Sequence, residues 1–169
     1  MNIKRVWAVY WSATGNTKTV VTAAAEGLAK KLDCPLSAID FTLPAAREKG
    51  MEFGPQDLVV IGTPTYAGKL PNKILPYVQE QIKGNGALAA AIVTFGNRNF
   101  DNSLAELCAV MEQNGFHTVS AGAFACIKCQ ACIRSCPNHA RYFDDPAFLS
   151  HVAMLEENFT EPKEDQLFW

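Results

Sequence analysis

The stretch "WSATGNT" (residues 11–17) gathers hydroxyl and amide side chains around one glycine and carries no charge. It follows "VWAVYW" (6–11), an apolar run typical of a strand buried on both faces. It leads into residues 18–32, where apolar side chains recur with the period of a helix. A strand, a polar turn and a helix in this order predict the first unit of an α/β sheet, with the turn at the carboxyl edge of the strand.

The same alternation continues along the chain and predicts an α/β fold, a doubly wound parallel sheet of five strands with helices on both faces. We expect residues 42–56 to form a long connection that contains a short helical turn. The four further strands are expected at 35–41, 57–62, 87–95 and 117–124, and two further helices at 72–82 and from 101 or 102 to the "NG" at 114–115.

Composition sets limits on the class of protein. The chain has 169 residues, 49% of them hydrophobic, which is enough for a domain with a full core. Its net charge of −2 gives no reason to expect a nucleic acid or membrane partner. The longest apolar run, residues 87–95, is too short to cross a bilayer, so we expect a cytoplasmic protein.

The polar turn has the chemistry of a phosphate site. Backbone N–H groups at a helix N-terminus favour an anion, and Gly15 allows the backbone to approach it closely. Ser12, Thr14, Asn16 and Thr17 add neutral donors. The alternative is a simple helix cap, for which one such residue suffices. The G-x-x-x-x-G-K-[ST] and G-x-G-x-x-G spacings are absent, which argues against ATP and against a dinucleotide.

Three segments together resemble the flavodoxin family. "SATGNT" (12–17) is similar to its FMN phosphate loop, "GTPTYAGKLPNKI" (62–74) to the loop after its third strand, and "TFGNRNFDN" (94–102) to the loop after its fourth. The resemblance covers about residues 3–125 and implies a sheet of order 2-1-3-4-5 with FMN at the carboxyl edge. It implies phosphate binding by Ser12, Ala13, Thr14, Gly15, Asn16 and Thr17, and ring contacts from Thr63, Pro64, Thr65, Tyr66, Ala67, Gly68, Thr94, Phe95, Gly96, Asn97 and Arg98.

The side chains agree with a flat aromatic cofactor. Tyr66 can stack on one face of the ring, with help from Phe95 or Phe100. Arg98 departs from the acidic pattern of low-potential flavodoxins. If its charge lies near the pyrimidine edge of the ring, we expect a raised reduction potential; the alternative is a solvated surface arginine.

The cysteines Cys126, Cys129, Cys132 and Cys136, followed by Pro137, have the C-x₂-C-x₂-C-x₃-C-P spacing of a bacterial four-iron four-sulfur site. Zinc is the alternative metal. In ferredoxins with two clusters the last cysteine of a run binds the other cluster, and this chain has one run only.

The whole chain resembles a family of flavodoxin–ferredoxin fusion proteins. That family has a closing helix and an earlier cysteine run between its two parts, so we expect that a stretch near residue 125 is missing. The expected domains are a flavodoxin-like FMN-binding domain at 1–125 and a short cysteine-rich segment at 126–169, with a terminal helix at 145–159.

Three functions are compatible with the sequence. The first is an electron-transfer protein that relays electrons between FMN and an iron–sulfur cluster, with a redox protein or a small-molecule electron acceptor as partner. The second is an FMN-dependent NAD(P)H:quinone or flavin reductase. The third is a non-redox binding module with a zinc-stapled tail. No residue pattern indicates a protein nucleophile or an acid–base pair.

Overall fold

The computed structural model describes residues 2–96, 99–125, 150, 153–154, 157–158 and 165–169. Its main sheet has six strands in the order β2-β1-β4-β6-β7-β8. Five of them run parallel, and the sixth pairs with β7 in the antiparallel sense. The strands of this sheet are β1 (Arg5–Tyr10), β2 (Leu36–Asp40), β4 (Asp57–Pro64), β6 (Leu88–Phe95), β7 (His117–Ala125) and β8 (Gln166–Phe168).

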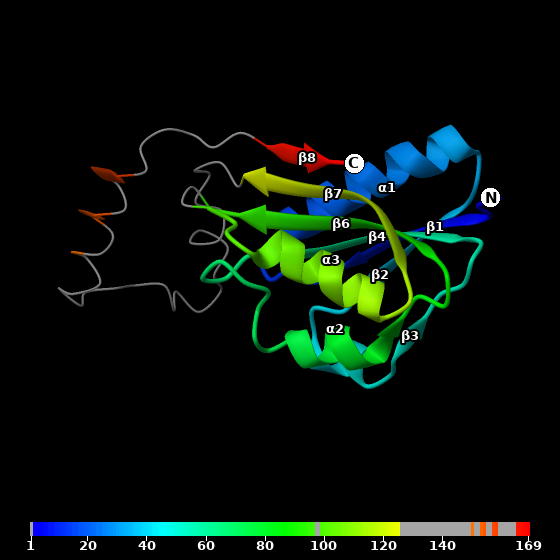
Figure 1. Ribbon diagram of the computed structural model, residues 1–169, viewed down its shortest axis with the longest axis horizontal. Helices are drawn as coiled ribbons and strands as arrows, with labels where there is room; N and C mark the ends of the chain where they lie inside the picture. Colours follow the sequence, from blue (N-terminus) through cyan, green and yellow to red (C-terminus); the bar gives the residue numbers. More distant parts are fainter. Residues whose placement is uncertain (1, 97–98, 126–149, 151–152, 155–156, 159–164) are drawn as a thin grey trace.

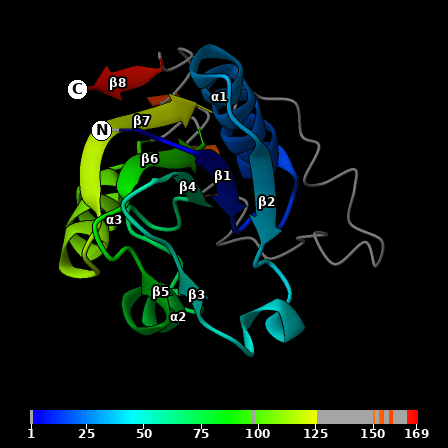
Figure 2. The same cartoon turned by 90° about the vertical axis from the view of Figure 1, so that its right-hand side faces the viewer.

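Helices cover both faces of the sheet (Figures 1 and 2). Helix α1 (Asn16–Leu32) packs on one face, where Val21, Ala25 and Ala29 join a buried cluster with residues of β1, β4 and β6. Helices α2 (Leu75–Gln81) and α3 (Ser103–Gln113) lie on the opposite face, over the larger cluster. The apolar runs of the sequence therefore become strands buried on both sides.

Glycine at one strand position decides how closely α1 approaches the sheet. A Cβ atom on Gly62 of β4 would lie 2.3 Å from Val21 Cγ2 and 3.2 Å from Thr17 Cγ2. Carbon atoms in contact are normally about 3.5–4.0 Å apart, so only glycine allows the observed packing. The start of α1, which borders the polar turn, is thus seated directly on β4.

The predicted helix end at 114–115 and the predicted helical turn within 42–56 are both confirmed. Pro76 lies in the first turn of α2, where its missing N–H costs no hydrogen bond. Helix α3 ends at Gln113, with Asn114 as C-cap and Gly115 in the left-handed region at φ 81°. The connection at 42–56 contains the expected helical turn, η1 (Pro44–Arg47), which is a 3₁₀ helix.

The prediction of a five-stranded sheet is wrong in its count. Strand β8 adds a sixth, antiparallel strand, with Gly122 opposite Leu167. The order 2-1-3-4-5 therefore describes only the five parallel strands, and the order of the full sheet differs. A second sheet, also not predicted, pairs β3 (Met51–Glu52) with β5 (Ile82–Lys83) in parallel.

The cysteine run at 126–136 and the expected closing stretch near residue 125 lie outside the described residues. Of the predicted helix at 145–159, the described residues 150, 153–154 and 157–158 are helical. In the part of the chain that the structure describes, no helix combines the length and the apolar character needed to cross a membrane.

Candidate functional site

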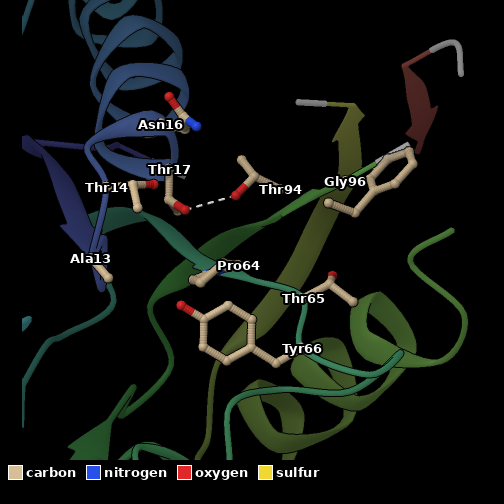
Figure 3. Close-up of a pocket in the computed structure, with 10 residues that line it drawn as sticks. Ala13, Thr14, Asn16, Thr17, Pro64, Thr65, Tyr66, Thr94 and Gly96 are labelled. Atoms are coloured by element: carbon tan, nitrogen blue, oxygen red, sulfur yellow. Dashed lines mark hydrogen bonds between the residues drawn. The ribbon is translucent and has the colours of Figure 1, made fainter. Parts of the chain in front are cut away.

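A cavity of about 190 Å³ opens at the carboxyl ends of the parallel strands, where α1 begins (Figure 3). Three chain segments build it: the turn after β1, the end of β4 with the turn that follows, and the end of β6. Its described lining carries no charged side chain. The lining residues are Ala13, Thr14, Asn16, Thr17, Pro64, Thr65, Tyr66, Thr94, Phe95 and Gly96.

The turn before α1 is shaped to leave backbone donors open. Gly15 adopts a left-handed conformation at φ 88°, and nothing lies within 4 Å of the position that a Cβ would take. The N–H of Thr19 is bonded to Gly15 O at 3.0 Å, and that of Lys18 to Ser12 Oγ at 3.0 Å. Among the described residues, the N–H groups of Gly15 and Thr17 have no acceptor. These donors meet the positive end of the α1 dipole, which favours a bound anion.

Ser12 and Thr42 fix this turn from the side of β2. The N–H of Ser12 donates to Thr42 Oγ1 at 2.9 Å, and the N–H of Thr42 donates to Asp40 Oδ1 at 2.9 Å. The Ser12 hydroxyl accepts from Lys18, so its own proton stays available for a ligand. Ser12 therefore caps one N–H of the first turn of α1, whereas the N-cap position itself is occupied by Gly15, which has no side chain with which to cap the helix.

Thr17 and Thr94 join the start of α1 to the end of β6. Their hydroxyl oxygens lie 2.7 Å apart, and both side chains are buried (Figure 3). One hydroxyl donates to the other, and the N–H of Thr65 donates to Thr94 O at 2.7 Å. These contacts therefore join the start of α1, the end of β6 and the residue that follows β4 at the cavity.

Tyr66 forms the opposite wall. Its side chain is 48% exposed, and Figure 3 shows its ring beside Pro64. Trp11, which the sequence argument did not single out, meets the Tyr66 ring edge-on, with centroids 5.8 Å apart and an interplanar angle of 82°. Its place in the quoted turn is the signal that could have found it. An aromatic ring that is about half exposed beside a cavity suits contact with a flat ligand.

The other residues predicted to contact the ring are buried, lie outside the cavity lining or fall outside the described residues. Phe95 lines the cavity but is 3% exposed, and its ring packs on Phe100 with centroids 5.3 Å apart. Thr63 is fully buried, and its hydroxyl has no hydrogen-bond partner among the residues that the structure describes. Five other predicted residues are not part of the lining: Ser12, Gly15, Ala67, Gly68 and Phe100. Asn97 and Arg98 lie outside the described residues.

The metal prediction is not tested by the described chain. Cys126, Cys129, Cys132 and Cys136 all fall outside it, and within it no group of three or more His, Cys, Asp or Glu side chains could hold a metal ion. Cys108 of α3 is half-buried, and burial, followed by the nearby Glu112 carboxylate, raises the pKa of its thiol. A raised pKa keeps the thiol protonated, which does not favour Cys108 as an additional metal ligand.

Comparison with solved structures identifies the fold. A flavodoxin from Streptococcus pneumoniae TIGR4 matches with a TM-score of 0.53 and 19% identity, over 72% of this chain and 83% of that one. The chain thus has a flavodoxin-like fold with a mostly parallel sheet. No family model matches the chain, and no curated protein matches it either.

Two further structures match at lower TM-scores. A putative flavoprotein from Bacteroides uniformis ATCC 8492 has a TM-score of 0.44 and 18% identity, over 74% of this chain and 90% of that one. A flavodoxin, WrbA-like protein from Agrobacterium tumefaciens has a TM-score of 0.39 and 22% identity, over 68% and 75%. At these TM-scores neither adds to the assignment of the fold.

Proposed function

We propose that the chain binds FMN in the cavity at the start of α1 and acts as an electron-transfer flavoprotein. The observation that carries the proposal is the pairing, in one uncharged cavity, of open backbone donors at a helix N-terminus with an exposed aromatic face. The backbone donors suit a phosphate, and the aromatic ring suits contact with a flat cofactor ring. The bound flavin would supply one- and two-electron redox chemistry.

The residues present fit this cofactor. The N–H groups of Gly15 and Thr17, with the hydroxyls of Ser12 and Thr14, would hold the phosphate, and Tyr66 would hold the ring. The cavity of about 190 Å³ is smaller than the roughly 300 Å³ at which ligand pockets usually begin. Part of the cofactor would therefore lie at the open rim beside Tyr66. This arrangement suits a carrier that exchanges electrons with a redox protein or a small-molecule acceptor.

Titration of the flavin-free protein tests the proposal. At a hundredfold excess over the dissociation constant, FMN should stabilise the fold by about 2.7 kcal/mol. For a domain of this size, that is a rise in melting temperature of roughly 5–11 °C. Quenching of flavin fluorescence should accompany it. If addition of FMN changes neither the melting temperature nor the flavin fluorescence, the proposal is refuted.

The phosphate part of the site has its own test. Thr14→Val keeps the shape of a residue that lines the cavity but removes its hydroxyl. Because hydrogen bonds to charged groups contribute about 1.5–3 kcal/mol, FMN affinity should fall by roughly 10- to 150-fold. Riboflavin, which lacks the phosphate, should bind both proteins equally. The matched control is Thr19→Val, because Thr19 is exposed and its hydroxyl bonds Gly15 O outside the lining.

The iron–sulfur cluster is a second, separate part of the proposal, and it rests on the cysteine spacing alone. Protein purified without oxygen should contain iron and acid-labile sulfide, and Cys129→Ser should lose both while FMN binding persists. Zinc in place of iron would instead support the non-redox binding module with a zinc-stapled tail.

Steady-state oxidation of NAD(P)H, with a quinone or flavin as acceptor, would support the reductase over the electron carrier.

A further inference from the structure

The chain after β4 folds into a tight hairpin that carries Tyr66. Tyr66 and Lys69 exchange two backbone hydrogen bonds, of 2.9 and 3.2 Å. The two residues between them have positive φ angles, 51° at Ala67 and 75° at Gly68. Two left-handed residues flanked by a reciprocal pair are the pattern of a type I′ turn. The hairpin is short, and its own two bonds do not determine where it lies relative to the cavity.

Helix α3 supplies the contacts that fix its position. Thr65 Oγ1 lies 2.6 Å from Ser103 Oγ, and the N–H of Asn102 donates to Gly68 O at 3.1 Å. The hairpin is also pressed against the helix start, because a Cβ on Gly68 would lie 2.3 Å from Asp101 Oδ2. The hairpin and the first turn of α3 therefore form one packed unit.

Glu106 of α3 provides a further contact between the helix and the hairpin. Its Oε2 accepts the N–H of Leu70 at 2.8 Å, at the residue where the chain leaves the hairpin. Leu70 is 1% exposed, so without the carboxylate a buried donor would lose its partner. The glutamate lies in the first turn of α3, where the helix dipole favours a negative charge. Glu106 does not itself line the cavity.

We infer that Glu106 is a positioning residue, which holds the 65–70 hairpin against α3 and thereby sets the Tyr66 ring at the wall of the cavity. The inference rests on the proposed function for its consequence in flavin binding, but the hairpin contact stands without it. Glu106 acts through its hydrogen bond and not through its charge. Glutamine, whose side-chain carbonyl can accept the same N–H, should therefore replace it.

The same helix offers a matched control. Oε1 of Glu112 accepts the N–H of Thr118 at 2.6 Å, so a second glutamate of α3 also binds a backbone donor of a neighbouring element. That contact lies at the other end of the helix, where β7 begins. Glu112→Ala thus removes the same kind of bond without touching the hairpin.

The experiment compares Glu106→Ala, Glu106→Gln and Glu112→Ala with the parent protein. In the flavin-free state, amide hydrogen exchange at Leu70 should be accelerated about tenfold or more in Glu106→Ala, as expected when a buried donor loses its acceptor. FMN affinity should fall by a similar factor, with less quenching of flavin fluorescence. Glu106→Gln should restore both values, and Glu112→Ala should leave both at parental values.

The outcomes separate this inference from the proposed function. If the parent protein binds no FMN, the proposed function fails, and exchange at Leu70 alone decides whether Glu106 holds the hairpin. Equal acceleration at Leu70 in Glu106→Ala and Glu112→Ala would mean general destabilisation and would overturn the inference. So would parental exchange in Glu106→Ala, or a Glu106→Gln variant that behaves like alanine.

Discussion

Replacement of Gly62 by alanine should destabilise the protein through the contact between α1 and β4. The new Cβ would lie 2.3 Å from Val21 Cγ2, whereas a normal carbon contact is about 3.5 Å or longer. The methyl groups of a helical valine have one strongly preferred rotamer, so Val21 cannot turn away cheaply. Ile92 O, at 3.3 Å, limits movement on the other side. Helix α1 must therefore rise from the sheet by about 1 Å.

The cost follows from this overlap. Overpacking of a close-packed core costs about 1–3 kcal/mol. The lower chain entropy of alanine in the unfolded state returns about 0.5–1 kcal/mol. The net loss is therefore at most about 2.5 kcal/mol and centres near 1 kcal/mol, and each 1 kcal/mol lost lowers the melting temperature by roughly 2–4 °C for a chain of this length. Since the start of α1 borders the cavity, FMN affinity should fall as well.

Urea unfolding followed by circular dichroism measures the effect, with Gly27→Ala as the control. Gly27 is exposed in the middle of α1, and nothing lies within 4 Å of its would-be Cβ. The same substitution should there stabilise the protein by about 0.5–1 kcal/mol, because glycine is a poor helix former. If Gly62→Ala stabilised the protein as Gly27→Ala does, the packing argument for α1 would be refuted.

Three further predictions concern single hydrogen-bond partners. Thr17→Val should cost about 1–3 kcal/mol in urea unfolding, because it leaves the buried hydroxyl of Thr94 without its partner at 2.7 Å; an unchanged midpoint would contradict it. The hydrogen bond from the backbone N–H of Thr118 holds the pKa of Glu112 below its ordinary value. The ionised form of Glu112 therefore stabilises the fold above about pH 4.3, and this contribution is lost as the pH falls further. Unfolding from pH 6 to pH 3 should therefore show a weaker pH dependence in Glu112→Gln, and an identical profile would count against the bond. Asp57→Ala should cost about 1–3 kcal/mol and shift the emission of Trp7, whose indole N–H donates to that carboxylate at 2.9 Å; emission at the parental wavelength would argue against this bond.

The candidate site could be predicted in part because each of its segments has a local signal. The polar turn at 11–17 was recognised from its own residues, and the structure brings Thr14, Asn16 and Thr17 to the cavity. Tyr66 and Thr94 were placed by the resemblance of their segments, 62–74 and 94–102, to flavodoxin loops. It was harder to predict which residues at the end of a strand face the cavity and which face the core. Thr63 is fully buried, while the adjacent Pro64 lines the cavity, because successive residues of a strand face opposite sides.

The sequence by itself determined the five parallel strands, the helices between them and the edge at which their polar turns meet. It could do so because these elements have local sequence signals. Continuous apolar runs indicate strands buried on both faces, and apolar residues at helical spacing indicate helices. Only the tertiary structure decided that β8 adds to β7, that β3 pairs with β5, and that Glu106 reaches the N–H of Leu70. These contacts join residues far apart in the chain, and no local pattern specifies them, since they depend on how the packed helices and strands bring those residues together.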